Sequence, residues 1–141
     1  MRLELTKRAD YAIRAALALA ADPAPRRSVP KIAADRGIPV RFLPQVMADL
    51  VAAEIVEGVA GRAGGYRLSR PATAITVLDV IEAVEGESRR RTCVLRGGPC
   101  LLDGVCDVHA VFAATQEAML QTLAGATLAS LVRSGRGVNA G

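Results

Sequence analysis

Apolar residues in the first part of the chain recur every three to four positions, which is the spacing of one face of an α-helix. Residues 6–21 are predicted to form a helix that Thr6 can cap. Shorter helices are predicted at 29–36 and 40–52, joined by a turn that contains Gly37 and Pro39. Two short helices joined so closely predict a helix-turn-helix. The expected apolar faces are Ala9, Ala12, Ile13, Ala16, Leu17 and Ala20 in the first helix, and Phe42, Leu43, Val46, Met47 and Leu50 in the third.

The pattern then changes to strand, turn and strand. Two β-prone segments, 55–60 and 66–70, flank the glycine-rich segment 61–65, which predicts a β-hairpin. This turn does not have the pattern of a nucleotide-binding loop, because it joins two strands and no Lys-Ser/Thr pair follows it. A helix-turn-helix followed by a basic hairpin is the winged-helix arrangement.

The second half is predicted to contain a helix at 77–85, a loop at 86–106, a long helix at 107–124 and a short helix at 128–133. The predicted fold class is therefore mainly α with a small β-hairpin. We expect a winged helix-turn-helix DNA-binding domain, a cysteine-rich loop and a long C-terminal dimerisation helix. The expected boundaries are 1–85 for the DNA-binding domain, 86–106 for the cysteine-rich loop, 107–133 for the dimerisation helix with the terminal helix, and 134–141 for a flexible tail.

The long helix carries an apolar stripe at helical spacing. One interpretation is that the stripe packs into the core of its own subunit. The favoured interpretation is that it pairs with a second copy across a twofold axis, as a palindromic DNA site requires. The predicted interface residues are Val108, Val111, Phe112, Thr115, Met119 and Leu123.

Charge is distributed unevenly along the chain. Residues 1–70 hold twelve Lys and Arg against seven Asp and Glu, a net of +5, whereas residues 71–141 hold six against seven, a net of −1. A basic half favours a polyanionic partner such as duplex DNA, although ordinary surface solubility explains the same charge. Aromatic residues make up only 3% of the chain, which disfavours a stacking surface for single-stranded nucleic acid. No apolar run approaches the roughly 20 residues of a membrane span, and no secretory signal is recognisable, so we expect a cytoplasmic protein.

The start of the third helix is the predicted base-reading region, because a helix fits the major groove. Val40, Arg41 and Gln45 lie there. Arginine can bind guanine through two hydrogen bonds, and glutamine can bind adenine in the same way. Arg62 is expected at the tip of the wing, where it can enter a narrow minor groove. The alternative is a winged helix that binds protein instead of DNA.

Three cysteines, Cys93, Cys100 and Cys106, lie within fourteen residues, and the only histidine, His109, follows them. Thiolates are soft ligands that favour zinc, copper(I) or iron–sulfur clusters. A zinc site could use the three thiolates and His109, but gaps of six and five residues are wider than the usual CxxC pair. A thiol redox switch and three buried apolar cysteines are the remaining alternatives. An enzyme is disfavoured, because there is no CxxC motif and one histidine provides little acid–base chemistry.

In this order the motifs resemble the IscR/NsrR-type family of bacterial winged-helix regulators, through residue 133. The matching pieces are residues 5–14 (LTKRADYAIR), 64–71 (GGYRLSRP), 81–86 (IEAVEG), the three-cysteine loop and 127–131 (TLASL). The resemblance implies a homodimeric repressor or activator with a [2Fe–2S] or [4Fe–4S] cluster in each subunit. The cluster state then controls the affinity for a palindromic operator. The first cysteine gap is one residue longer than the commoner spacing, and Pro44 replaces a recognition-helix glutamate of IscR.

The resemblance gives two candidates for the fourth cluster ligand. In IscR-like members it is a histidine three residues after the last cysteine, which corresponds to His109. In NsrR-like members it is an aspartate from the first helix of the partner subunit, which corresponds to Asp10. The segment 118–131 looks more like the nitric-oxide-sensing branch, so Asp10 and a repressor that senses nitric oxide are the first choice. A regulator of cluster supply or redox state is the second choice, and a zinc-stabilised protein-interaction module is the alternative from another class.

Overall fold

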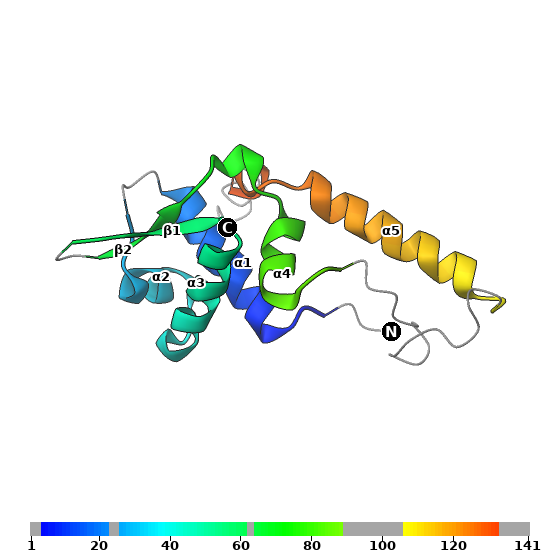
Figure 1. Ribbon diagram of the computed structural model, residues 1–141, viewed down its shortest axis with the longest axis horizontal. Coiled ribbons are helices and arrows are strands. Elements are labelled where there is room, and N and C mark those ends of the chain that lie inside the picture. The colour runs from blue at the N-terminus through cyan, green and yellow to red at the C-terminus, as the bar shows by residue number, and fades with distance from the viewer. Residues whose placement is uncertain (1–3, 23–25, 62–63, 89–105, 133–141) are drawn as a thin grey trace, which may run out of the picture.

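The computed structural model describes residues 4–22, 26–61, 64–88 and 106–132. A compact body holds most of the helices and the hairpin, and the last long helix projects from it (Figure 1). The predicted class, mainly helical with a two-stranded antiparallel hairpin, is confirmed. The elements in chain order are α1 Lys7–Ala21, α2 Val29–Arg36, η1 Val40–Phe42, α3 Leu43–Ala52, β1 Val56–Val59, β2 Gly65–Leu68, η2 Ala72–Ala74, α4 Val77–Glu85 and α5 His109–Gly125. Residues 128–132 form a further short helical segment.

Helix α1 lies at the centre of the body and packs against α2, α3, α4 and β2. The Thr6 hydroxyl caps the helix by accepting a hydrogen bond from the backbone N–H of Ala9 at 3.1 Å, as predicted. The predicted apolar face is too narrow, because neighbours surround the helix on several sides. Ile13, Leu17 and Ala20 are only half-buried, whereas the buried set is Ala9, Ala12, Ala15, Ala16, Ala18 and Leu19. These mostly small side chains allow the surrounding elements to approach α1 closely.

The predicted third helix is divided into the 3₁₀ turn η1 and the helix α3. Pro44 has no backbone N–H, so it cannot donate to the carbonyl of Val40, and Leu43 donates to that carbonyl instead. The prediction that Phe42 lies on the inner face is wrong, because this residue is 36% exposed at the end of η1. The other four predicted core positions, Leu43, Val46, Met47 and Leu50, are buried.

The hairpin forms the wing, with Val56 opposite Leu68 and Val59 opposite Gly65. Arg27 adds a short antiparallel bridge to it: Arg27 and Tyr66 exchange two backbone hydrogen bonds of 2.8 Å each. A Cβ on Gly65 would lie 2.5 Å from the carbonyl oxygen of Arg27, so this close approach requires glycine.

The chain returns to the body after α5. The backbone N–H of Val77 donates to the carbonyl of Ala126, and that of Leu128 donates to the carbonyl of Ile75, both at 2.9 Å. Leu128 and Ile75 are fully buried in the same hydrophobic core as α1 and α3. The C-terminal end of α5 is therefore attached directly to the core of the body.

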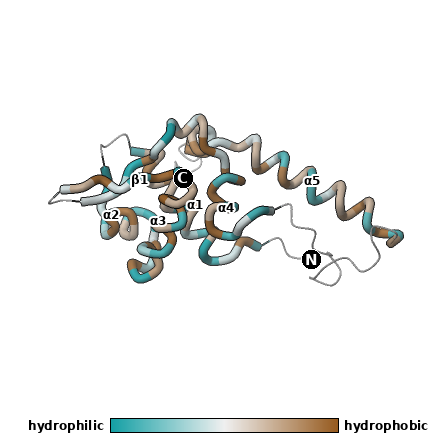
Figure 2. The backbone as a smooth tube through the Cα atoms, viewed as in Figure 1, coloured by the Kyte–Doolittle hydropathy of each residue, from teal (hydrophilic) through white to brown (hydrophobic). Residues whose placement is uncertain are grey.

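Helix α5 begins at His109, two residues later than predicted, and contacts the body mainly through α4. Leu120 is the buried residue of α5. Figure 2 shows that hydrophobic residues continue along α5 to the end that lies away from the body. Among the described residues, no helix combines the length and the apolar character needed to cross a membrane.

Candidate nucleic-acid interface and metal centre

Three of the four predicted DNA-contacting residues lie together on the surface of the helix-turn-helix. Val40 and Arg41 belong to η1, and Gln45 lies in the first turn of α3. All three are exposed, and Val40 is 54% exposed although its side chain is apolar. The fourth residue, Arg62, lies outside the described residues.

Gln45 does not extend freely into solvent. Its Nε2 donates a hydrogen bond to Oδ1 of Asp49 at 3.2 Å, one helical turn along α3. The second carboxylate oxygen of Asp49, Oδ2, pairs with the guanidinium of Arg8 from α1. Arg8 and Asp49 were not predicted as site residues. The i,i+4 spacing of Gln45 and Asp49 is a signal in the sequence, whereas the pairing with Arg8 depends on the packing of α1 against α3.

Arg41 is also in contact with a neighbouring side chain. Its guanidinium carbon lies 4.8 Å from the centroid of the Phe42 ring, which is the geometry of a cation–π contact. The Phe42 ring in turn lies 5.3 Å from the ring of Tyr11 on α1. Phe42 was expected in the core, but its ring lies at the surface and packs between Tyr11 and Arg41. Arg8 thus contacts Asp49, which holds Gln45, and Tyr11 contacts Phe42, which holds Arg41. Arg8 and Tyr11 lie three residues apart on α1.

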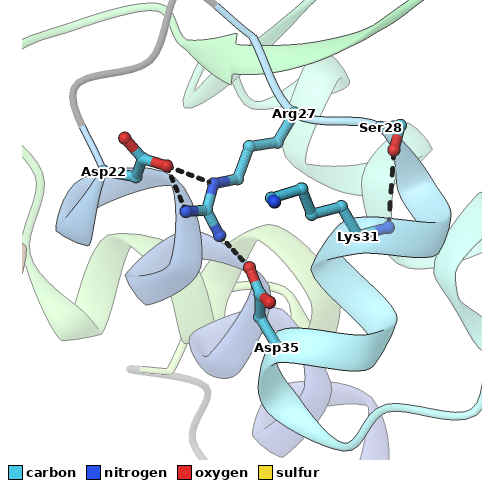
Figure 3. Close-up of polar contacts among 5 residues, drawn as sticks. All are labelled: Asp22, Arg27, Ser28, Lys31 and Asp35. Atoms are coloured by element: carbon cyan, nitrogen blue, oxygen red, sulfur yellow. Dashed lines mark hydrogen bonds and ion pairs between the residues drawn. The ribbon is translucent and has the colours of Figure 1, made fainter.

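The base of the wing is fixed to the helices by Arg27. Figure 3 shows its guanidinium between the carboxylates of Asp22, at the end of α1, and Asp35 on α2. The Arg27 side chain is only 13% exposed, so both carboxylates compensate a largely buried charge. Its backbone pairs with Tyr66 of the wing. Arg27 therefore joins α1, α2 and β2, and this role was not predicted from the sequence.

Asp10, the first-choice fourth ligand, lies in the first turn of α1 with 41% of its side chain exposed. Its Oδ1 accepts a hydrogen bond from Nε of Arg14 at 2.9 Å. The same guanidinium donates through Nη1 to the carbonyl oxygen of Arg36, the last residue of α2, at 3.4 Å. Asp10 is thus accessible and is linked through Arg14 to the end of the first helix of the helix-turn-helix.

Cys106 and His109, at the start of α5, are close neighbours. The backbone N–H of His109 donates to the carbonyl of Cys106 at 3.1 Å. The Cys106 thiol is free and half-buried, and His109 is exposed. Cys93 and Cys100 lie outside the described residues, as do the rest of the segment 89–105, residue 133 and the predicted tail 134–141. Among the described residues, no three side chains that could bind a metal lie together. The described residues include only one of the three cysteines, Cys106.

The predicted interface stripe on α5 is largely uncovered in the described part of the chain. Val111 is 66% exposed, Met119 41% and Val108 38%, and Thr115 is exposed as well. Phe112 and Leu123 are half-buried, on the side of the stripe nearer to Leu120. The stripe therefore contributes little to the core of its own subunit.

These features together define a winged-helix DNA-binding protein. The model of the Rrf2 family, described as iron-dependent transcriptional regulator, matches residues 5–134. The chain belongs to this family, as the resemblance implied. It is a DNA-binding transcription regulator and not an enzyme, which confirms both predictions.

Similar proteins include two named regulators and a solved structure. The chain is 32% identical to the HTH-type transcriptional regulator NsrR of Geobacillus kaustophilus, with 92% of the chain and 90% of that protein covered. It is 31% identical to the regulator IscR of Escherichia coli, with 94% and 82% covered. The structure of CymR, the global cysteine regulator of B. subtilis, has a TM-score of 0.80 at 24% identity, covering 94% of this chain and 98% of that one. The last likeness concerns the fold alone.

Proposed function

We propose that the protein is a cytoplasmic, homodimeric repressor whose affinity for a palindromic operator is controlled by an iron–sulfur cluster that senses nitric oxide. The observation that carries this proposal is the position of Asp10. In the sequence of α1 it lies between Arg8 and Tyr11. Arg8 contacts Asp49, the hydrogen-bond partner of Gln45, and Tyr11 contacts Phe42, which packs against Arg41. A change at Asp10 would therefore act on the helix that supports both candidate base-reading side chains.

The available donors fit an iron–sulfur cluster in kind. Three thiolates, Cys93, Cys100 and Cys106, are the soft ligands that such clusters use. Cys106 supports this assignment because its thiol is free and adjoins α5. Either Asp10 from the partner subunit or His109 would complete the set. When bound, the cluster would supply iron that reacts with nitric oxide, and an oxygen ligand would leave that iron more open to attack than a fourth thiolate.

The chain's own residues provide a connection from Asp10 to the DNA-binding surface. The Asp10 carboxylate is held by Arg14, so its use as a ligand in a partner's site requires this ion pair to loosen. Arg14 also donates to the carbonyl of Arg36 at the end of α2. Ligation by Asp10 would thereby change a contact that holds α1 against the helix-turn-helix. This connection couples the two sites because DNA would bind the two arrangements with different affinity.

His109, the alternative ligand, would act along a different route. It is the first residue of α5, and the other end of α5 is joined to the core through Ala126 and Leu128. Ligation by His109 would therefore change the direction of α5. That route is the one expected of a regulator that responds to cluster supply or redox state.

Homodimerisation is supported by the exposed stripe on α5. Val111, Met119 and Val108 would lose contact with water against a second copy, which is a favourable change. Two copies related by a twofold axis would present two recognition helices to half-sites about 34 Å apart. A change in the angle between the subunits would then move both helices away from their half-sites.

The test for the cluster is the composition of protein purified without oxygen. We expect brown protein with iron and acid-labile sulfide, and loss of both in Cys106→Ala, while circular dichroism shows that the winged helix remains folded. Colourless protein that contains zinc would support the zinc-stabilised alternative and contradict the cluster proposal.

The fourth ligand is tested by comparing Asp10→Ala with His109→Ala in the same preparation. We expect Asp10→Ala to alter the visible spectrum and the rate of reaction with nitric oxide, and His109→Ala to match the parent. Because Asp10→Ala also removes the ion pair with Arg14, Arg14→Ala is the matched control and should keep the parent spectrum. The reverse result, an altered spectrum in His109→Ala alone, would assign the ligand to His109.

A further inference from the structure

The hydrogen bond between Gln45 and Asp49 fixes which way the Gln45 amide is turned. An ionised carboxylate accepts hydrogen bonds and cannot donate them. The Asp49 oxygen must therefore face the amide nitrogen of Gln45, as it does at 3.2 Å, and repels the amide oxygen. Rotation of the amide by half a turn would place two acceptor oxygens against each other.

This orientation leaves a defined pair of groups for a base. The Gln45 nitrogen carries two N–H bonds, of which one is used by Asp49. The second N–H and the amide oxygen remain, one donor beside one acceptor. Adenine presents the complementary pair in the major groove, with N7 as acceptor and the N6 amino group as donor. Without a fixed amide, the two orientations would both occur and the order of donor and acceptor would be undefined.

Asp49 is itself held by a residue of another helix. Its Oδ2 pairs with the guanidinium of Arg8 on α1, and its side chain is 21% exposed. Arg8 is 53% exposed, so the ion pair contributes little to stability. It does restrict rotation of the carboxylate, which then keeps Oδ1 towards Gln45.

We propose that Asp49 and Arg8 are positioning residues that fix the orientation of the Gln45 amide and thereby set the base preference at one position of each half-site. The proposal rests on the proposed base-reading role of Gln45. It differs from that role because Asp49 and Arg8 act through Gln45 rather than on the base.

The experiment is selection of binding sites from a randomised DNA duplex library by the full-length protein purified without oxygen, followed by sequencing. Gln45→Ala identifies the base pair that Gln45 reads. We expect Asp49→Asn to weaken the preference at that same base pair by about tenfold, since asparagine accepts either amide orientation. Preferences at the other positions should stay as in the parent. In the double variant with Gln45→Ala, Asp49→Asn should cause no further loss.

Glu57→Gln is the matched control, because it removes the same charge from an exposed ion pair with Arg67 on the wing strands. It should change affinity for all sequences alike and leave every base preference intact. Arg8→Gln is a second test variant, at a residue that is more exposed than Asp49. Thermal unfolding verifies that each variant is folded. Unchanged preference at the Gln45 position in both Asp49→Asn and Arg8→Gln would overturn the proposal. Failure of Gln45→Ala to change any preference would instead overturn the base-reading role, and the positioning role with it.

Discussion

The hydroxyl of Thr6, at the start of α1, donates a hydrogen bond to the carboxylate of Glu85, the last residue of α4. The same hydroxyl accepts the N–H of Ala9 and so caps α1. The cysteine-rich loop begins directly after α4 in the sequence. Thr6 therefore connects the helix that carries Asp10 with the chain that leads to the cysteines. Helix α5 is also connected to the start of this loop, because Nε2 of Gln116 donates to the carbonyl of Ser88 at 3.3 Å.

Replacement of Thr6 by valine removes both bonds and keeps the shape of the side chain. We expect Thr6→Val to lower the free energy of unfolding by about 1 kcal/mol, mainly through loss of the helix cap. Thr6→Ser keeps the hydroxyl and should stay close to the parent. Urea unfolding followed by circular dichroism measures the difference, and equal stability of the valine and serine variants would show that the cap contributes nothing.

The close approach of the wing to Arg27 gives a second prediction. Gly65→Ala should lower stability by roughly 1–3 kcal/mol, because the new methyl group would lie 2.5 Å from a backbone carbonyl oxygen. Gly58→Ala on the facing strand is the control, since its methyl group would meet only the Tyr66 ring at 3.9 Å. Thermal unfolding of the two variants should differ clearly. An alanine at 65 that is as stable as one at 58 would show that the wing does not sit against Arg27.

The proposed homodimer has the exposed stripe of α5 at its interface. Val111→Glu places a charge at the most exposed of its large apolar residues and should raise the dimer dissociation constant by at least about tenfold. Ala113→Glu adds the same charge to an exposed site on the opposite side of the helix, given its spacing of about 100° per residue. Sedimentation velocity at several protein concentrations measures both. Dimers of Val111→Glu as tight as those of Ala113→Glu would place the interface elsewhere.

Local patterns in the sequence predicted most of the helices and strands, because caps, turns and apolar spacing depend on residues that are close together in the chain. Thr6 caps α1 as predicted, and Ser28 and Thr76 cap α2 and α4 from similar positions before apolar runs. The predicted burial of Phe42 was wrong because the helical spacing assumed one continuous helix. Pro44 interrupts the hydrogen bonds of the first turn of that helix. The missing N–H of Pro44 is the signal in the sequence that indicates this break.

The supporting residues of the recognition surface could not be predicted in the same way. Arg8 and Asp49 are separated by 41 positions, and Tyr11 and Phe42 belong to different helices. Their contacts follow from how α1 packs across α3, which no local pattern contains. The burial of Leu128 beside Ile75 is of the same kind, because the chain must first pass along the whole of α5.

The proposed function requires that the cluster controls the affinity of the protein for DNA. The most direct measurement is the dissociation constant for a selected operator, at fixed salt and without oxygen, before and after titration with nitric oxide. Affinity for DNA depends steeply on salt, so both measurements must share one buffer. If the cluster controls binding, affinity falls by at least about a hundredfold as the visible absorption of the cluster is lost, and Cys106→Ala binds as weakly as the treated parent. Equal affinity of the intact, treated and Cys106→Ala proteins would contradict the proposed function.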